Sequence, residues 1–77
     1  MNTKIDEILV STLHISPADI TDQLTMSEVE TWDSLQHMDL IASLEQVFGV
    51  EFTFEEIVSM QSVAEIKRVL HGKGVDV

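Results

Sequence analysis

Cysteine is absent from this sequence, and its absence excludes two ways of stabilising a small protein. Without Cys the chain can form neither a disulfide framework nor a metal site held by thiolates. Packing must therefore stabilise the fold, and 77 residues of which 44% are apolar supply one small core. We expect a single domain over residues 1–77 that is ordered over about 3–70.

Positive charge is scarce as well. Four Lys and Arg stand against 14 Asp and Glu, which gives a formal net charge of −10. Lys4 is the only Lys or Arg before Lys67, so residues 5–66 contain neither. The shortage argues against nucleic acid, whose phosphates are bound through Lys and Arg, and against anionic membrane surfaces. Protein partners should instead present basic patches.

Long apolar stretches and strong strand signals are also missing. No apolar run approaches the roughly 20 residues of a membrane-spanning helix, so no membrane insertion is expected. The opening residues Asn2, Thr3 and Lys4 do not resemble a secretory signal peptide. Residues 50–54 alternate in polarity, but one such segment cannot form a sheet alone. The default interpretation is a cytoplasmic, soluble monomer.

The apolar residues that are present recur with helical spacing. Residues 3–13 are predicted to form an amphipathic helix, and Pro17 prevents its continuation. Residues 14–33 form a long polar connection, in which short turns are expected. Its apolar side chains should pack onto the bundle, and they are Ile15, Ile20, Leu24 and Met26.

Capping residues mark the remaining helices. Asp33 is a good N-cap for a helix over 34–48, with Gln36 at its third position, and Gly49 suits its C-terminal end. Two Ser/Thr-x-x-Glu capping boxes follow. The first opens a short helix over about 54–59 and the second a helix to about Leu70, and residues 71–77 should fray.

These elements define the expected fold class. It is all-α: an antiparallel bundle of three main helices plus one short helix, with a long loop between the first and second helices.

The helix over 34–48 is predicted to have two apolar faces. With Ser34 at 0° and about 100° per residue, a core stripe spans about 220–340° and comprises Leu40, Ile41, Leu44, Val47 and Phe48. A second group at about 40–100°, here called the docking patch, comprises Leu35, Met38 and Ala42, with Asp39 and Glu45 at its edges. A helix in a small bundle buries one face, so the docking patch should be partly exposed and available to a partner. Alternatively, its residues pack beneath the 14–33 connection.

Ser34 stands directly after the capping acid, in the first turn of this helix. Free backbone N–H groups and the helix dipole favour a phosphate at that position. Serine is also a common residue at the first helical position. This feature alone therefore does not decide between a phosphate attachment site and an ordinary helix start.

The run Asp33-Ser34-Leu35, with the spacing to Leu40, Leu44, Glu45 and Phe48-Gly49, resembles the phosphopantetheine attachment motif of acyl carrier proteins. The resemblance covers roughly residues 3–70. It implies that a phosphopantetheinyl transferase attaches 4′-phosphopantetheine from coenzyme A to the Ser34 hydroxyl, and that Asp33 helps to place this transferase. Leu35, Met38 and Ala42 then match apolar contact positions, and Asp39 and Glu45 match acidic recognition positions.

The resemblance also implies a non-catalytic role. The protein would carry acyl groups as thioesters on the cofactor's thiol and pass them between acyl-activating, condensing or acyltransferase enzymes with basic docking patches. Trp32 and the uncharged residues Gln36, Gln46 and Val47 depart from carriers of fatty acid synthesis. They favour a specialised polyketide, lipid or surface-polymer pathway. Two alternatives are an aminoacyl or peptidyl carrier and an unmodified acidic helical module that binds a basic or amphipathic partner.

The remaining candidates for chemistry are weak. His14, His37 and His71 lack the spacing of metal ligands, so no metal site is expected. His37 falls at about 300° on the wheel, which predicts a partly buried, neutral side chain. Trp32 is predicted to cap the end of the bundle. No nucleophile, base and oxyanion set can be assembled, so no catalytic residues are predicted.

Overall fold

A computed structural model describes residues 4–75. Its elements are α1 (Lys4–Leu13), the short 3₁₀ helices η1 (Pro17–Asp19) and η2 (Met26–Glu28), then α2 (Ser34–Phe48), α3 (Phe54–Ser59) and α4 (Val63–Gly72). Within residues 4–75 the only β-type pairing is an isolated bridge between Thr25 and Ser62. The all-α class, with three longer helices and one short helix, is confirmed.

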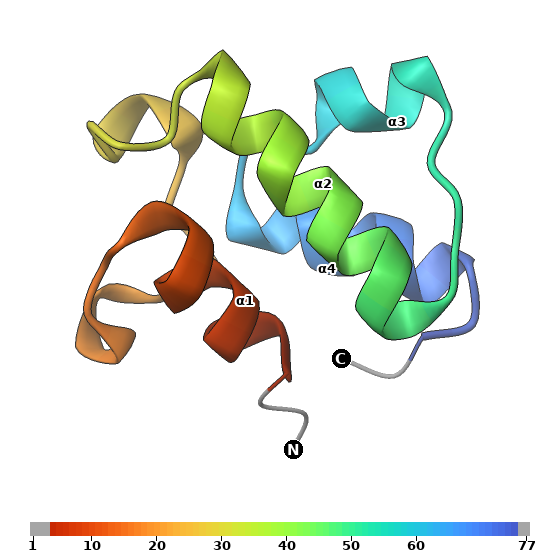
Figure 1. Cartoon of the computed structure of the whole chain (residues 1–77), viewed down its shortest axis with the longest axis horizontal. Helices are drawn as coiled ribbons and strands as arrows, with labels where there is room; N and C mark the ends of the chain where they lie inside the picture. The colour runs from red at the N-terminus through yellow and green to blue at the C-terminus, as the bar shows by residue number, and fades with distance from the viewer. Residues whose placement is uncertain (1–3, 76–77) are drawn as a thin grey trace.

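The longer helices enclose one core. Figure 1 shows α2 passing in front of α4, with α1 at the lower left and the short α3 at the upper right. Helices α1 and α2 contact each other directly. The connection between them carries both 3₁₀ helices, where the sequence predicts a long polar loop with short turns.

Local capping sets the ends of α2. Asp33 has an extended backbone, and its Oδ1 accepts a hydrogen bond of 2.9 Å from the Gln36 N–H. Gly49 adopts the left-handed conformation at φ 65° and donates its N–H to the Glu45 carbonyl. Both predicted ends are confirmed.

The predicted capping box of α3 is complete, whereas that of α4 forms only one of its two hydrogen bonds. Thr53 and Glu56 form both hydrogen bonds of a capping box, and Ser62 accepts from the Glu65 N–H at 3.1 Å. Beyond Leu70, where the sequence predicts fraying, α4 continues to Gly72. Val75 then donates its N–H to the Leu70 carbonyl at 3.0 Å and packs against the core. Residues 76–77 lie outside the described part of the chain.

The long connection is tied to the start of α4. The Met26 N–H donates to the Gln61 carbonyl at 2.8 Å, and the Val63 N–H donates to the Leu24 carbonyl at 3.0 Å. The four apolar side chains predicted to pack onto the bundle are partly buried against the core. The connection is therefore a packed part of the fold.

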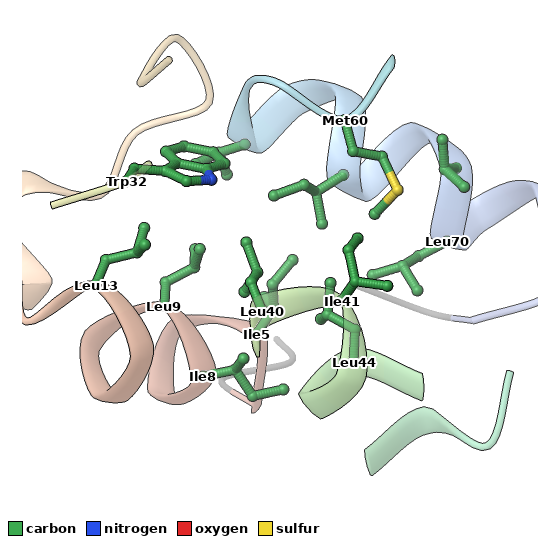
Figure 2. Close-up of a cluster of buried hydrophobic side chains, with 13 residues drawn as sticks. Ile5, Ile8, Leu9, Leu13, Trp32, Leu40, Ile41, Leu44, Met60 and Leu70 are labelled. Carbon is green, nitrogen blue, oxygen red and sulfur yellow. The ribbon is translucent and has the colours of Figure 1, made fainter. Parts of the chain in front are cut away.

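The core draws residues from three helices and from two positions outside them. Figure 2 shows the side chains of Leu9 and Leu13 pointing toward the Trp32 ring, with Met60 and Leu70 farther along the cluster. The buried members are Ile5, Ile8, Leu9, Leu13, Trp32, Leu40, Ile41, Leu44, Met60, Val63, Ile66, Val69 and Leu70.

One member of the predicted core stripe lies elsewhere. Val47 is 45% exposed, whereas Leu40, Ile41 and Leu44 are buried and Phe48 is partly buried. Val47 stands at the edge of the stripe, at about 220° on the wheel. The exposed fraction of 45% shows that packing covers this edge of the stripe only in part.

Contacts from the C-terminal end hold α3 in place. The Lys73 ammonium lies 2.9 Å from Glu56 Oε1 and 5.4 Å from the centre of the Phe52 ring. The hydrogen bond from Lys73, followed by that from the Thr53 backbone, lowers the pKa of the Glu56 carboxyl below its ordinary value. The ionised form of Glu56 is thus the one that the fold favours.

Candidate functional site

Ser34 is the first residue of α2 and is exposed. Within residues 4–75 its hydroxyl makes no hydrogen bond to another protein group. A hydroxyl that is exposed and free of internal partners is accessible to an incoming reagent. The structure therefore leaves this oxygen accessible to another molecule.

Backbone groups at the start of α2 suit a phosphate ester. The Asp33 carboxylate accepts from the third helical N–H, that of Gln36. The N–H groups of Ser34 and Leu35 have no acceptor among the described residues. Free N–H groups and the positive end of the helix dipole favour a negatively charged phosphodiester on the Ser34 oxygen.

The segment before Ser34 is anchored on several sides. The Thr31 hydroxyl donates to the Leu13 carbonyl at the end of α1, and the Trp32 N–H donates to the Val29 carbonyl at 3.0 Å. The Trp32 side chain is only 2% exposed. The sequence predicts that Trp32 caps the bundle end, and the structure places its ring inside the core cluster.

The docking patch is open to solvent. Leu35 is 70% exposed, Met38 is 53% exposed, and Ala42 and Asp39 are also exposed. These side chains do not pack beneath the 14–33 connection, so that alternative is wrong. The predicted exposure of a second apolar face on α2 is confirmed, and its use by a partner stays a prediction.

Glu45, at the other edge of the patch, also serves the fold. It is half-buried, and its Oε2 accepts a hydrogen bond of 3.0 Å from the Phe52 N–H. One carboxylate oxygen thus holds the connection between α2 and α3. A partner that contacts Glu45 has to bind the other carboxylate oxygen, Oε1, or a free lone pair of Oε2.

Sequence reasoning missed two exposed apolar residues on α3. Phe54 is 78% exposed and Val58 is 49% exposed. They are four residues apart and so lie on one side of the helix. That i, i+4 spacing is visible in the sequence, but a six-residue helix offers too few positions to show which face is buried.

The pairing of Trp32 with His37 was missed as well. The indole Nε1–H donates to His37 Nδ1 at 3.0 Å, and His37 Nε2 lies 2.8 Å from the Ile57 carbonyl oxygen. The indole nitrogen can only donate, so Nδ1 accepts, and Nε2 carries the proton that is donated to Ile57. His37 is 7% exposed, in this neutral tautomer, as its wheel position predicts.

Comparison with known proteins agrees with this geometry. Residues 3–70 match the model of the family described as "Phosphopantetheine attachment site". The acyl carrier protein of Rubrobacter xylanophilus is 34% identical over 62 residues, which cover 80% of this chain and 76% of that protein. The acyl carrier protein of Coprothermobacter proteolyticus is 30% identical over 67 residues, covering 87% and 82%. That of Thermosynechococcus vestitus is 29% identical over 70 residues, covering 91% and 86%.

The chain belongs to the acyl carrier protein family, whose members bear a phosphopantetheine attachment site. The prosthetic group is 4′-phosphopantetheine, attached covalently, and the enzymes that work with this family are a phosphopantetheinyl transferase and the enzymes of a biosynthetic pathway. The exposed hydroxyl and free N–H groups at the start of α2 fit that group. None of the helices described over residues 4–75 is long and apolar enough to cross a membrane.

Proposed function

We propose that this chain receives 4′-phosphopantetheine on Ser34 and carries acyl intermediates as thioesters between partner enzymes. The observation that supports the proposal best is the Ser34 hydroxyl, exposed and without an internal hydrogen bond at the start of α2. It stands within the region matched by the attachment-site family. The cytoplasm, where coenzyme A is available to the transferase, is the location proposed for this reaction.

The chain's own residues have limited tasks in this scheme. The Ser34 oxygen would give up its proton and bond to the phosphorus on the pantetheine side of coenzyme A. The pyrophosphate bond of coenzyme A breaks in the same step, its adenosine bisphosphate half leaves, and the Ser34 oxygen becomes the ester oxygen of a phosphodiester. The free N–H groups of Ser34 and Leu35 favour the negative charge beside that oxygen. When attached, the prosthetic group supplies the thiol that forms the thioester. The chain holds and presents the acyl group, and the bond-making steps belong to partner enzymes, so the role is non-catalytic.

The docking patch would receive those partners. Leu35, Met38 and Ala42 offer an exposed apolar surface, and Asp33, Asp39 and Glu45 surround it with negative charge. We expect each partner enzyme to match this patch with an apolar contact surface and with Lys or Arg at its rim. These partners are the phosphopantetheinyl transferase and acyl-activating, condensing and acyltransferase enzymes. Attraction between these charges increases the rate of association more than it increases the final affinity.

A specialised pathway is the favoured setting. Trp32 stands directly before Asp33 and fills the core, and the first turn of α2 carries Gln36 rather than an acid. This surface is thus less charged than the net charge of −10 suggests. We propose cargo of a polyketide, lipid or surface-polymer type, and mass analysis of the loaded protein would distinguish it from an aminoacyl or peptidyl group.

Intact-protein mass spectrometry tests the proposal. Incubation with a broad-specificity phosphopantetheinyl transferase and coenzyme A should add the mass of one phosphopantetheine group. Ser34→Ala should gain nothing and retain its helical circular dichroism, because alanine at the first helical position is compatible with the helix. Ser43→Ala, on the same helix, is the matched control and should load normally. An adduct on Ser34→Ala would place the attachment site at another residue.

A further inference from the structure

We propose that Trp32 and His37 are positioning residues for the modification of Ser34. They form a hydrogen-bonded chain, here called the Trp32–His37 link, that runs from the indole through the imidazole to the Ile57 carbonyl. The link holds the residues next to Ser34 in one arrangement and ties them to α3. This inference rests on the proposed modification of Ser34 and adds two residues to it.

The link is unusual because it is polar within an apolar core. His37 is the only buried polar side chain among the described residues of the core, and both of its ring nitrogens have partners. Burial of an apolar side chain has no preferred direction, whereas two hydrogen bonds have preferred distances and angles. A buried polar chain whose groups are all satisfied therefore specifies a single geometry.

The position of Trp32 connects this geometry to the reaction site. Trp32 directly precedes the N-cap Asp33, and Asp33 directly precedes Ser34. The indole is held by His37, which lies in the first turn of α2, three residues after Ser34. The link thus joins the chain before the attachment site to the chain after it and encloses Ser34 between two fixed points.

The other end of the link reaches α3. Ile57 is in the last turn of the short α3, and its carbonyl already accepts a hydrogen bond of 3.3 Å from the N–H of Met60, the residue that caps the helix. His37 Nε2 donates to that carbonyl at 2.8 Å. The next residue, Val58, is 49% exposed. Together with the Lys73 contacts, the link therefore fixes the position of α3 relative to the start of α2.

The position of the Ser34 hydroxyl matters because a separate enzyme transfers the phosphopantetheine group to it. The transferase must find the Ser34 oxygen at a fixed place relative to the surface on which it docks. Movement of a reacting atom by about 1 Å can slow a reaction by up to about two orders of magnitude. Loosening the Trp32–His37 link should lower the rate of the chemical step and leave docking on α2 largely intact.

Four variants test this inference. Trp32→Phe keeps an aromatic ring in the core and removes the N–H donor. His37→Leu fills a similar volume with an apolar side chain and removes both hydrogen bonds. His37→Gln can still accept a hydrogen bond from Trp32 and donate one to Ile57. Ile41→Val is the matched control, since Ile41 is equally buried on the same helix, at 2% exposure, and takes no part in the link.

Initial rates of phosphopantetheine transfer, measured over a range of carrier concentrations below the melting temperature of every variant, give kcat and KM. For Trp32→Phe and His37→Leu we expect kcat to fall about three- to tenfold, with KM changed less than about twofold. A fifth protein that combines Trp32→Phe with His37→Leu should be no slower than the slower of these two single variants, because both changes break one link. His37→Gln should restore most of kcat, and Ile41→Val should keep it.

Heteronuclear NMR of the tryptophan indole N–H provides a readout that does not depend on loading. This proton should exchange slowly with solvent in the wild-type protein and in His37→Gln, and faster in His37→Leu. The inference is wrong if Trp32→Phe and His37→Leu load at the wild-type kcat, or if His37→Gln is as slow as His37→Leu. It is also wrong if kcat follows the melting temperature across all variants, including Ile41→Val. A wild-type protein that gains no mass would overturn the proposed function and this inference together.

Discussion

Met38 lies one helical turn after Ser34 on the same side of α2, and both residues are exposed. A protein that covers the Met38 side chain is therefore brought close to the Ser34 hydroxyl. On the other side of α2, Val47 is exposed to a similar extent but points away from Ser34 on the helical wheel. These two apolar side chains allow a comparison of a docking surface with an equally exposed surface elsewhere.

Met38→Glu should slow modification with little effect on stability. A carboxylate in the docking patch would have to lose its water when the transferase binds, so we expect kcat/KM to fall about tenfold, equivalent to about 1.4 kcal/mol. A surface change of this kind should alter the free energy of unfolding by less than about 0.5 kcal/mol. Transferase kinetics and thermal melting by circular dichroism measure the two effects. Val47→Glu is the matched control and should load at the wild-type rate; equal slowing of both variants would assign the effect to added charge alone.

Asp39→Lys should slow association in a manner that depends on salt. Reversing this exposed charge replaces attraction to a basic partner by repulsion, which acts mainly on the association rate. The deficit should shrink as ionic strength rises, because salt screens charges that are exposed to solvent. Stopped-flow or surface-binding measurements at two salt concentrations would show this. Asp19→Lys, in η1, makes the same charge change away from the patch, and a matching deficit there would indicate that only net charge matters.

Added salt should raise the melting temperature of the protein. The net charge of −10 and the absence of Lys and Arg from residues 5–66 leave the carboxylates to repel one another in the folded state. Screening that removes about 1 kcal/mol of repulsion corresponds to about 4–8 °C for a domain of this size. Divalent cations should act at lower concentration than NaCl. A melting temperature that stays constant from low to moderate salt would contradict the prediction.

Glu56→Gln should destabilise the protein at neutral pH and much less in acid. The hydrogen bond from Lys73 lowers the pKa of the Glu56 carboxyl below its ordinary value of 4.5 in the folded protein. A lowered pKa means that this group contributes stability above about pH 4.5 and that the contribution is lost as the pH falls through the folded-state pKa. The difference in melting temperature between wild type and variant should therefore be positive at pH 7 and shrink toward zero in acid.

Thermal melts at a series of pH values check this dependence. Glu51→Gln is the control, because Glu51 is exposed and has no ion pair among the described residues. That variant should melt close to the wild type at each pH. A Glu56→Gln difference that is the same at pH 7 and in acid would show that the ion pair with Lys73 does not stabilise the fold.

The starts of α2, α3 and α4 and the end of α2 could be predicted because their causes are local. Asp33 caps α2 through an N–H three residues away, and Thr53 and Glu56 cap α3 over the same spacing. Gly49 ends α2 by adopting a conformation that other residues rarely take. The exposed face of Leu35 and Met38 followed from helical periodicity, since a small bundle covers one side of α2.

Features that join distant segments could not be predicted in this way. The sequence places His37 on the core side of α2, but a wheel does not show that Ile57, 20 residues later, supplies its second hydrogen-bond partner. Helical periodicity places Val47 in the core stripe, and only the structure shows that its side chain is 45% exposed. Likewise, α4 extends past Leu70 to Gly72, and Val75 turns back onto the core.

Sequence alone therefore determined the helical class, the capped start of α2 and the placement of Ser34 within it, because side chains and backbone groups a few residues apart decide these features. Only the tertiary structure decided how that start is held. The Trp32 indole, the His37 imidazole and the Ile57 carbonyl meet because three segments pack around one core, and a buried donor must find an acceptor wherever the packing provides one.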